Sequence, residues 1–268
     1  MICEDVAQPL RSLLIKHRLD SLDGALAFEA GSDLDKPGLG HRRRTKAQFT
    51  DDDGGTHVFF IKRYGKERLR DRLKRRLEGG KASGPAGIEY ANIVAANKLG
   101  VTRMRAVAWG QSRDAGYLVV SAVAGEALSR QDDEFWRKQN QDAAAASVLG
   151  GELASLAWRL HEGGYCHRDM YACHIFLCGP SESGNDLSLI DLARMFRPRW
   201  RKRRWRVKDL AELHSSLPTE WLARYWDGFL DRYTALSADD KTKLGRAVER
   251  KSAGIRAQLL RRCRRRQS

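Results

Sequence analysis

The spacing of hydrophobic residues changes near residue 124. Upstream, apolar runs with the length and composition of buried strands occur at residues 58–62, 104–109 and 117–122. Residues 86–99 carry an apolar stripe at helical spacing and are followed by a glycine, which predicts one helix among these strands. Downstream, helical spacing dominates three long stretches, residues 141–161, 219–233 and 238–262. The pattern predicts an α+β fold, strand-rich over residues 1–123 and mainly helical over residues 124–268.

The first part also contains three less regular segments. Residues 1–24 have leucines near helical spacing and predict an amphipathic lead-in. Gly31, Gly38 and Gly40 separate the first two predicted strands and fit either a loop that covers phosphate groups or an ordinary glycine-bearing hairpin. Residues 66–78 predict a very basic helix, whose charges form either a solvated face or a patch for an anionic surface.

A pattern with chemical meaning follows the first long helix of the second part. His167-Arg168-Asp169 precedes a predicted β-hairpin over residues 175–190, which ends at Asp191. A hairpin of this length would return Asp191 to Asp169. Phosphoryl transfer needs one carboxylate at the acceptor hydroxyl and another on Mg²⁺. We therefore expect Asp169 to be the catalytic base and Asp191 to bind the metal and the nucleotide.

The same order of elements is found in protein kinases, whose catalytic loop has the pattern H-R-D-L-x-x-x-N. The tripeptide alone is weak evidence, but a helix, this loop, a hairpin and an Asp in sequence are much less expected by chance. His174 takes the place of the metal-binding Asn, so we place it at the metal and nucleotide site. Because Mg²⁺ prefers oxygen ligands, His174 is expected to act through a water or by orienting Asp169. Asp209 begins the next predicted helix and resembles the aspartate that braces the loop in kinase-like folds.

Lys62 and Glu89 form a second candidate pair. In kinases a lysine on the third strand holds the α- and β-phosphates, and a glutamate on the next helix steers it. Lys62 ends a predicted strand and Glu89 lies on the helix at residues 86–99, so we predict that they form this ion pair. The alternative is that Lys62 merely ends a strand and Glu89 is solvated. Residues 123–127 take the place of the hinge that contacts adenine, and Glu126 is a candidate ribose contact.

Positive charge is concentrated after Asp191. The net charge is +15, and the densest basic run covers residues 197–208, where Trp200 and Trp205 are interleaved. Such a charge predicts an anionic partner: nucleic acid, an acidic membrane face or a phosphorylated substrate. The run takes the place of a kinase activation segment, beside the acceptor, and arginine suits forked recognition of phosphate or carboxylate. The predicted acceptor-binding residues are Arg197, Arg199, Arg201, Arg203 and Arg204.

Several protein classes are disfavoured by composition. No apolar run approaches the roughly 20 residues of a transmembrane helix, and residues 1–20 lack the basic-then-apolar order of a signal peptide. Five cysteines without paired short spacing do not indicate a disulfide framework or a zinc site. We expect a cytoplasmic protein whose basic surface can contact the inner face of the cytoplasmic membrane.

The motifs together resemble the lipopolysaccharide core kinases, the Kdo and heptose kinase family. The resemblance covers about residues 40–217 and rests on residues 160–176, Ile190-Asp191-Leu192-x-Arg194 and Arg204-Trp205-Arg206-x-Lys208-Asp209-Leu210. It implies a two-lobed protein-kinase-like fold, with an N-lobe at residues 1–123 and a C-lobe at residues 124–268. It also implies a requirement for ATP and Mg²⁺ and transfer of the γ-phosphate to a sugar hydroxyl of an anionic glycolipid, the lipopolysaccharide inner core. His at position 174 is characteristic of this family.

Three other functions stay open on the sequence. A kinase of the same fold could act on protein or another small molecule, because a fold does not fix the acceptor. A non-catalytic binding module could keep the fold and the basic surface, although such modules commonly lose one of Lys62, Asp169 and Asp191. Nucleic-acid binding would suit an Arg and Trp surface, but this run lies beside the predicted active site and on no recognisable nucleic-acid-binding fold.

Overall fold

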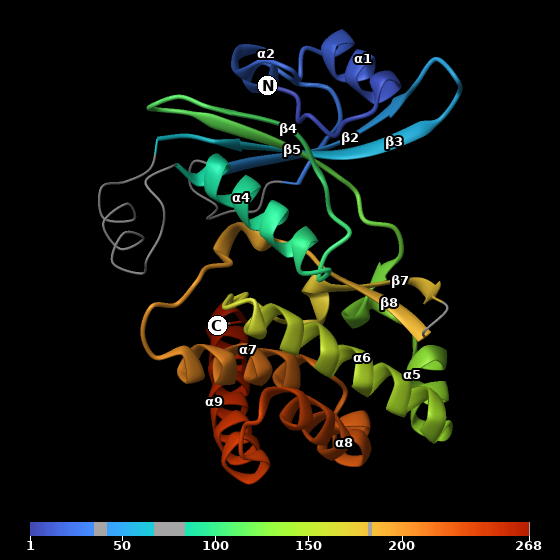
Figure 1. Ribbon diagram of the computed structural model, residues 1–268, viewed down its shortest axis with the longest axis vertical. Helices are drawn as coiled ribbons and strands as arrows, with labels where there is room; N and C mark the ends of the chain where they lie inside the picture. The colour runs from blue at the N-terminus through green and yellow to red at the C-terminus, as the bar shows by residue number, and fades with distance from the viewer. Residues whose placement is uncertain (35–41, 67–83, 182–183, 268) are drawn as a thin grey trace. The chain divides into compact units, whose positions relative to one another are not determined.

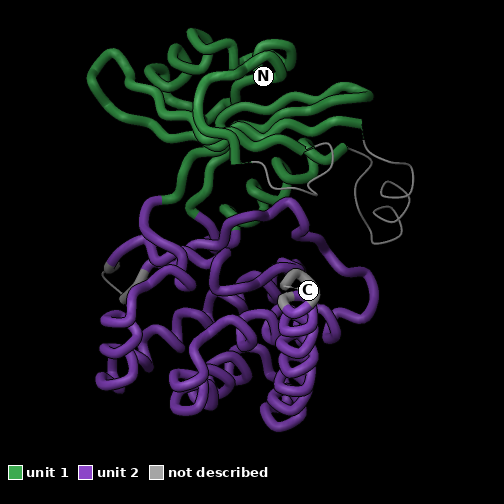
Figure 2. The backbone as a smooth tube through the Cα atoms, turned by 180° about the vertical axis from the view of Figure 1, so that it is seen from behind, with its two compact units in different colours: residues 1–98, 103–123 green, residues 99–102, 124–268 purple. Residues whose placement is uncertain are grey.

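The computed structural model describes residues 1–34, 42–66, 84–181 and 184–267 (Figure 1). The chain forms two compact units (Figure 2). Unit 1 contains residues 1–98 and 103–123, and unit 2 contains residues 99–102 and 124–268. Gly38, Gly40 and nearly all of the predicted basic helix at residues 66–78 lie outside the described residues.

The described residues of unit 1 form a five-stranded antiparallel sheet with the order β1-β2-β3-β5-β4. Its strands are β1 (Ser32–Asp33), β2 (Arg42–Thr50), β3 (Thr56–Tyr64), β4 (Ala106–Gln111) and β5 (Gly116–Ser121). The three apolar runs of the first part fall in β3, β4 and β5, which confirms the strands predicted there.

Side chains of β3 alternate between the two faces of this sheet, as in any strand. Phe59 and Ile61 are buried in a core that includes leucines from the region of α1 (Gln8–Lys16), and α1 and α2 (Leu22–Leu26) lie on that face (Figure 1). Helix α4 (Pro85–Lys98) lies on the opposite face. The residue after Ile61, Lys62, therefore points toward α4.

Unit 2 combines a small antiparallel sheet with a bundle of helices. The sheet has the order β6-β7-β8, with β6 (Glu126–Ala127), β7 (Ile175–Ser181) and β8 (Gly184–Leu189). The helices are α5 (Asp133–Gln141), α6 (Ala143–Glu162), α7 (Lys202–Ser216), α8 (Thr219–Ser237) and α9 (Lys241–Gln267). Asp132 and Asp142 begin α5 and α6 by accepting hydrogen bonds from backbone N–H groups of the first turn. Helix α6 packs on α8, and α7 packs on α9.

Residues 99–102 belong to unit 2 because they are bonded to its hairpin. The carbonyl of Val101 accepts a hydrogen bond from the backbone N–H of Leu189 at 2.9 Å. The hydroxyl of Thr102 donates to the carbonyl of Leu189 at 2.6 Å. This short segment therefore fixes the end of β8, two residues before Asp191.

Two helices extend beyond the predicted limits. Helix α7 begins at Lys202 and not at Asp209, so residues 202–208 of the basic run are helical. Helix α9 continues to Gln267, beyond the helix predicted at residues 238–262. Arg and Lys have high helix propensity, which favours both extensions. Within the described residues, no helix is both long enough and apolar enough to cross a membrane.

Packing between α6 and α8 depends on Trp221, which is fully buried. A side chain at Gly150 of α6 would lie 3.7 Å from its ring. We expect Trp221→Ala to lower the free energy of unfolding by about 3–5 kcal/mol, because the cavity cannot close completely. Trp200→Ala is the matched control, since Trp200 is 72% exposed. This variant should change the free energy of unfolding by less than about 0.5 kcal/mol. Urea denaturation measures both, and similar losses in the two variants would contradict the assignment of Trp221 to the core.

Candidate active site

The loop that carries Asp169 begins with a sharp reversal at the end of α6. Gly164 has φ +80°, a conformation that residues with a side chain rarely adopt. The next part of the loop is held by paired backbone bonds between Cys166 and Phe196, at 2.9 and 3.1 Å. The chain is thus turned away from the helix axis and tied to the segment that follows Asp191.

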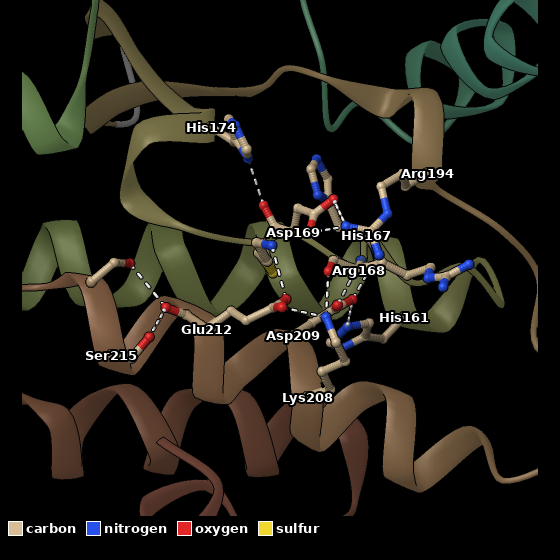
Figure 3. Close-up of polar contacts among 12 residues, drawn as sticks. His161, His167, Arg168, Asp169, His174, Arg194, Lys208, Asp209, Glu212 and Ser215 are labelled. Atoms are coloured by element: carbon tan, nitrogen blue, oxygen red, sulfur yellow. Dashed lines mark hydrogen bonds and ion pairs between the residues drawn. The ribbon is translucent and has the colours of Figure 1, made fainter. Parts of the chain in front are cut away.

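Asp209 of α7 holds the backbone of this loop. One carboxylate oxygen accepts from the backbone N–H of His167 at 2.7 Å, and the other accepts from the N–H of Arg168 at 2.8 Å (Figure 3). His161 Nε2 lies 3.3 Å from the same carboxylate, and its Nδ1 is 2.9 Å from the hydroxyl of Tyr233. Burial acts to raise the pKa of Asp209, but the hydrogen bond from His161 and those from the backbone outweigh it and lower the pKa. The predicted bracing role of Asp209 is confirmed.

Three further side chains of α7 bind the same loop. Glu212 accepts from the backbone N–H of Met170 at 3.2 Å, and the hydroxyl of Ser216 accepts from the N–H of Ala172 at 2.8 Å. The ammonium group of Lys208 donates to the carbonyl of Arg168 and to Glu212. Burial raises the pKa of Glu212 to about 7, against the opposing effect of Lys208.

Lys208, Glu212 and Ser216 were not predicted to support the loop, although the spacing of two of them was informative. Asp209, Glu212 and Ser216 are three and four residues apart and therefore share one face of a helix. That face contributes acceptors to four backbone N–H groups, those of residues 167, 168, 170 and 172. Because α7 makes these bonds from a single rigid element, the loop that carries Asp169 is preorganised.

The side chain of Asp169 projects from the loop to Arg194. Arg194 Nη1 donates to Asp169 Oδ1 at 2.6 Å and to Oδ2 at 2.7 Å (Figure 3). The Asp169 side chain is 21% exposed and that of Arg194 is 51% exposed, so a dissolved molecule can reach the pair.

His174 and Asp191 lie next to this loop. His174 Nδ1 donates to the backbone carbonyl of Asp169 at 2.7 Å, and Nε2 lies 3.9 Å from a carboxylate oxygen of Asp191. Burial acts to lower the pKa of His174, but hydrogen bonds with Cys173 and Asp169 raise it to about 9. His167 is buried and donates from Nε2 to the carbonyl of Ile190 at 2.9 Å. The hairpin therefore returns Asp191 to the loop, and His174 contacts both aspartates, as an orienting residue would.

Asp191 is the carboxylate best suited to Mg²⁺. Its side chain is 39% exposed, and a carboxylate oxygen is a preferred ligand of this ion. Among the described residues, His161, Cys166 and Asp209 also bring ligand atoms within 4.8 Å of one another. That group is buried, and both oxygens of Asp209 already accept hydrogen bonds from the loop, so we assign it a structural role.

The predicted pair of Lys62 and Glu89 forms within unit 1. The ammonium group of Lys62 donates to one carboxylate oxygen of Glu89, and the hydroxyl of Tyr64 donates to the other. Glu89 is only 1% exposed, which rules out the solvated alternative. In unit 2, Glu126 is half exposed and lies 3.4 Å from Arg130 Nη1. Its strand, β6, pairs with β7, which begins one residue after His174.

The basic run divides into bound and exposed side chains. Arg197 donates to the carbonyl of Gly163 at 3.3 Å and lies over the ring of Tyr165. Arg206 pairs with Asp239 at 3.2 Å. The remaining predicted acceptor-binding residues are exposed: Arg199, Arg201, Arg203 and Arg204.

Arg168 lies in an aromatic environment. Its guanidinium lies 5.2 Å from the ring centre of Phe196 and 5.3 Å from that of Trp205. Cation–π attraction of this kind stabilises a charge that is removed from water. Trp205 is therefore part of the support of the loop, whereas Trp200 is exposed.

A sheet-rich unit with a Lys–Glu pair and a helical unit with this loop and hairpin define a protein-kinase-like protein. The model of the lipopolysaccharide kinase (Kdo/WaaP) family matches residues 38–233, and the chain belongs to this family. A solved structure described as WaaP in complex with acyl carrier protein has the same fold, with a TM-score of 0.68 and 26% sequence identity. That similarity covers 93% of this chain and 98% of the other.

Two curated relatives are lipopolysaccharide core heptose(I) kinases named WaaP. The protein from Pseudomonas aeruginosa is 30% identical over 136 residues, and that from Escherichia coli strain K12 is 26% identical over 136 residues. Each match covers 48% of this chain and 51% of the relative. The chain thus spans about half the length of the curated relatives it matches.

The support of the loop by Asp209 can be tested by Asp209→Asn. The amide keeps the shape but removes the charge and turns an N–H group toward existing donors. We expect the free energy of unfolding to fall by about 2–4 kcal/mol. Asp227→Asn is the control, because Asp227 is 79% exposed and makes a surface ion pair with Lys241; the loss should stay below about 1 kcal/mol. If both variants unfold at the wild-type denaturant midpoint, Asp209 does not hold the loop.

Proposed function

We propose that this protein transfers the γ-phosphate of ATP to a sugar hydroxyl, of heptose or Kdo, in the lipopolysaccharide inner core. The observation that carries the proposal is Asp169, which projects from a loop whose backbone is fixed by one face of α7. Membership of the Kdo/WaaP family supports a sugar acceptor. The names of the two curated relatives, which are lipopolysaccharide core heptose(I) kinases, support an acceptor in the lipopolysaccharide core.

Asp169 is the proposed general base. The acceptor hydroxyl would give its proton to a carboxylate oxygen of Asp169 as its own oxygen forms a bond to the γ-phosphorus. The bond from that phosphorus to the oxygen shared with the β-phosphate breaks, and ADP leaves. Because such a transition state needs little covalent help, the main contribution of the protein is to position the hydroxyl and to neutralise charge.

The residues present fit ATP and Mg²⁺. Bound ATP supplies the phosphoryl group, and Mg²⁺ neutralises the charge that develops on it. Lys62, held by the buried carboxylate of Glu89, would bind phosphate oxygens of the nucleotide. Asp191 would bind the metal, and His174 would orient the backbone of Asp169 through its Nδ1 bond. Glu126 is proposed as a ribose contact.

The exposed part of the basic run supports an anionic acceptor at a membrane surface. Arg199, Arg201, Arg203 and Arg204 are exposed, and Trp200 beside them is 72% exposed. Each basic side chain near an anionic leaflet contributes about 1 kcal/mol of attraction, and this attraction weakens with salt. We propose that this surface of a cytoplasmic protein contacts the inner face of the cytoplasmic membrane while an acidic glycolipid is bound. Arg197 and its neighbours would hold acidic groups of the acceptor.

A variant of the proposed base tests the chemistry. Asp169→Asn should reduce turnover by about 10²- to 10⁴-fold, because a positioned general base typically contributes this range. Asp231→Asn is the control, since Asp231 is 63% exposed and pairs with Lys241; it should retain wild-type turnover. The measurement is transfer of labelled γ-phosphate to purified inner-core glycolipid. Near-normal transfer by Asp169→Asn would remove Asp169 from the mechanism.

The same assay distinguishes the proposed acceptor from the alternatives. Transfer to intact glycolipid, with little transfer to a generic protein, supports the sugar kinase. Preferential labelling of the protein would favour a protein kinase of the same fold. Binding of glycolipid without consumption of ATP would favour a non-catalytic module.

A further inference from the structure

Arg194 contacts Asp169 in a way that leaves half of its guanidinium group available. The contact uses a single nitrogen, Nη1, which donates to both carboxylate oxygens at 2.6 and 2.7 Å. Within the described residues, Arg194 makes no other hydrogen bond. Its side chain is 51% exposed.

The available edge is the one that recognises anions. A guanidinium group has five N–H donors in a fixed plane, two of them on Nη1. The other three, on Nε and Nη2, can form the paired hydrogen bonds that arginine makes with a carboxylate or a phosphate. Arg194 can therefore hold Asp169 and an external anion at the same time.

The contact does not prevent Asp169 from acting as a base. Each carboxylate oxygen has two lone pairs, and Nη1 engages one on each oxygen. A lone pair on either oxygen stays available for an acceptor hydroxyl. An anion on the outer edge of Arg194 would thus lie one side chain away from the hydroxyl that reacts.

Neighbouring arginines are less suited to this position. Arg197 is bonded to the carbonyl of Gly163 and lies over Tyr165, and Arg206 is paired with Asp239. Among the described residues, Arg194 is the arginine bonded to the side chain of the proposed base. Arg194 is the last residue of the short helical turn at residues 192–194, which directly follows Asp191.

We infer that Arg194 binds an anionic group of the acceptor, a carboxylate or a phosphate, through Nε and Nη2 while Nη1 holds Asp169. Arg194 then determines a preference for acidic sugars, and it places the base only a short distance from the recognised charge. The inference rests on the proposed function and adds the residue that selects the acceptor.

Binding of oligosaccharides tests this role without requiring transfer. The probes are the inner-core oligosaccharide with its Kdo carboxylates and phosphates intact, a carboxyl-reduced form, and a phosphatase-treated form. Isothermal titration without ATP is performed on the wild type, Arg194→Gln and Arg194→Lys. Arg224→Gln is the control, because Arg224 is 53% exposed and pairs with Glu220 on the surface of α8. Thermal unfolding verifies that each variant is folded.

We expect the wild type to bind the intact oligosaccharide about 10- to 100-fold more tightly than one of the two neutralised forms. The form that binds weakly identifies the recognised group as carboxylate or phosphate. Arg194→Gln should lose most of this preference, because only the contacts of Arg197 and its neighbours with acidic groups remain. Arg194→Lys should keep more of it, and Arg224→Gln should behave as the wild type.

Retention of the full preference by Arg194→Gln would overturn the inference. So would equal binding of all three probes by the wild type. A loss of ATP binding in Arg194→Gln, with the oligosaccharide preference unchanged, would assign the anion to the nucleotide and also overturn it. Wild-type protein that binds the acidic oligosaccharide through Arg194 but transfers no phosphate would support this inference and refute the proposed function.

Discussion

The site depends on the hydrogen bonds that the buried carboxylate of Asp209 accepts. A charge removed from water is stable only when hydrogen bonds replace its hydration. Here the replacement comes from the backbone of His167 and Arg168 and from His161. The requirement to satisfy this charge therefore fixes the backbone immediately before Asp169.

The rest of the site extends from this fixed point. Glu212, Ser216 and Lys208 continue the contacts along the loop, so that its conformation is set by one helix. His167 and His174 then tie the loop to the end of the hairpin and to Asp191. This series of contacts positions the two carboxylates, those of Asp169 and Asp191, without relying on a flexible connection.

The basic run serves two purposes that its composition does not separate. Trp205, Arg206 and Lys208 face inward and support the loop and the bundle. Residues 199–204, which include Trp200, are exposed. Burial increases along the start of α7: residues 202–204 are exposed, residues 205–208 are partly buried and Asp209 is buried, so the division follows position along the helix.

The fold and the main carboxylates could be predicted because they depend on local pattern and spacing. The apolar runs gave β3, β4 and β5, and the motif around Asp169 gave the loop and the hairpin. Glu212 and Ser216 share a helix face with Asp209, but their spacing does not show which loop that face meets, so they were not identified as loop supports. Arg194 was recognised as part of a motif, but its contact joins residues 25 positions apart and depends on the turn after Asp191.

Amide hydrogen exchange at His167 and Arg168 tests the central claim most directly. Both N–H groups donate to the buried carboxylate of Asp209, so they should exchange only when unit 2 opens extensively. The account predicts that these two amides exchange as slowly as amides in the middle of α6, measured by NMR in the wild type. Exchange as rapid as that of an unprotected loop would show that Asp209 does not fix the backbone before Asp169, and would contradict the account.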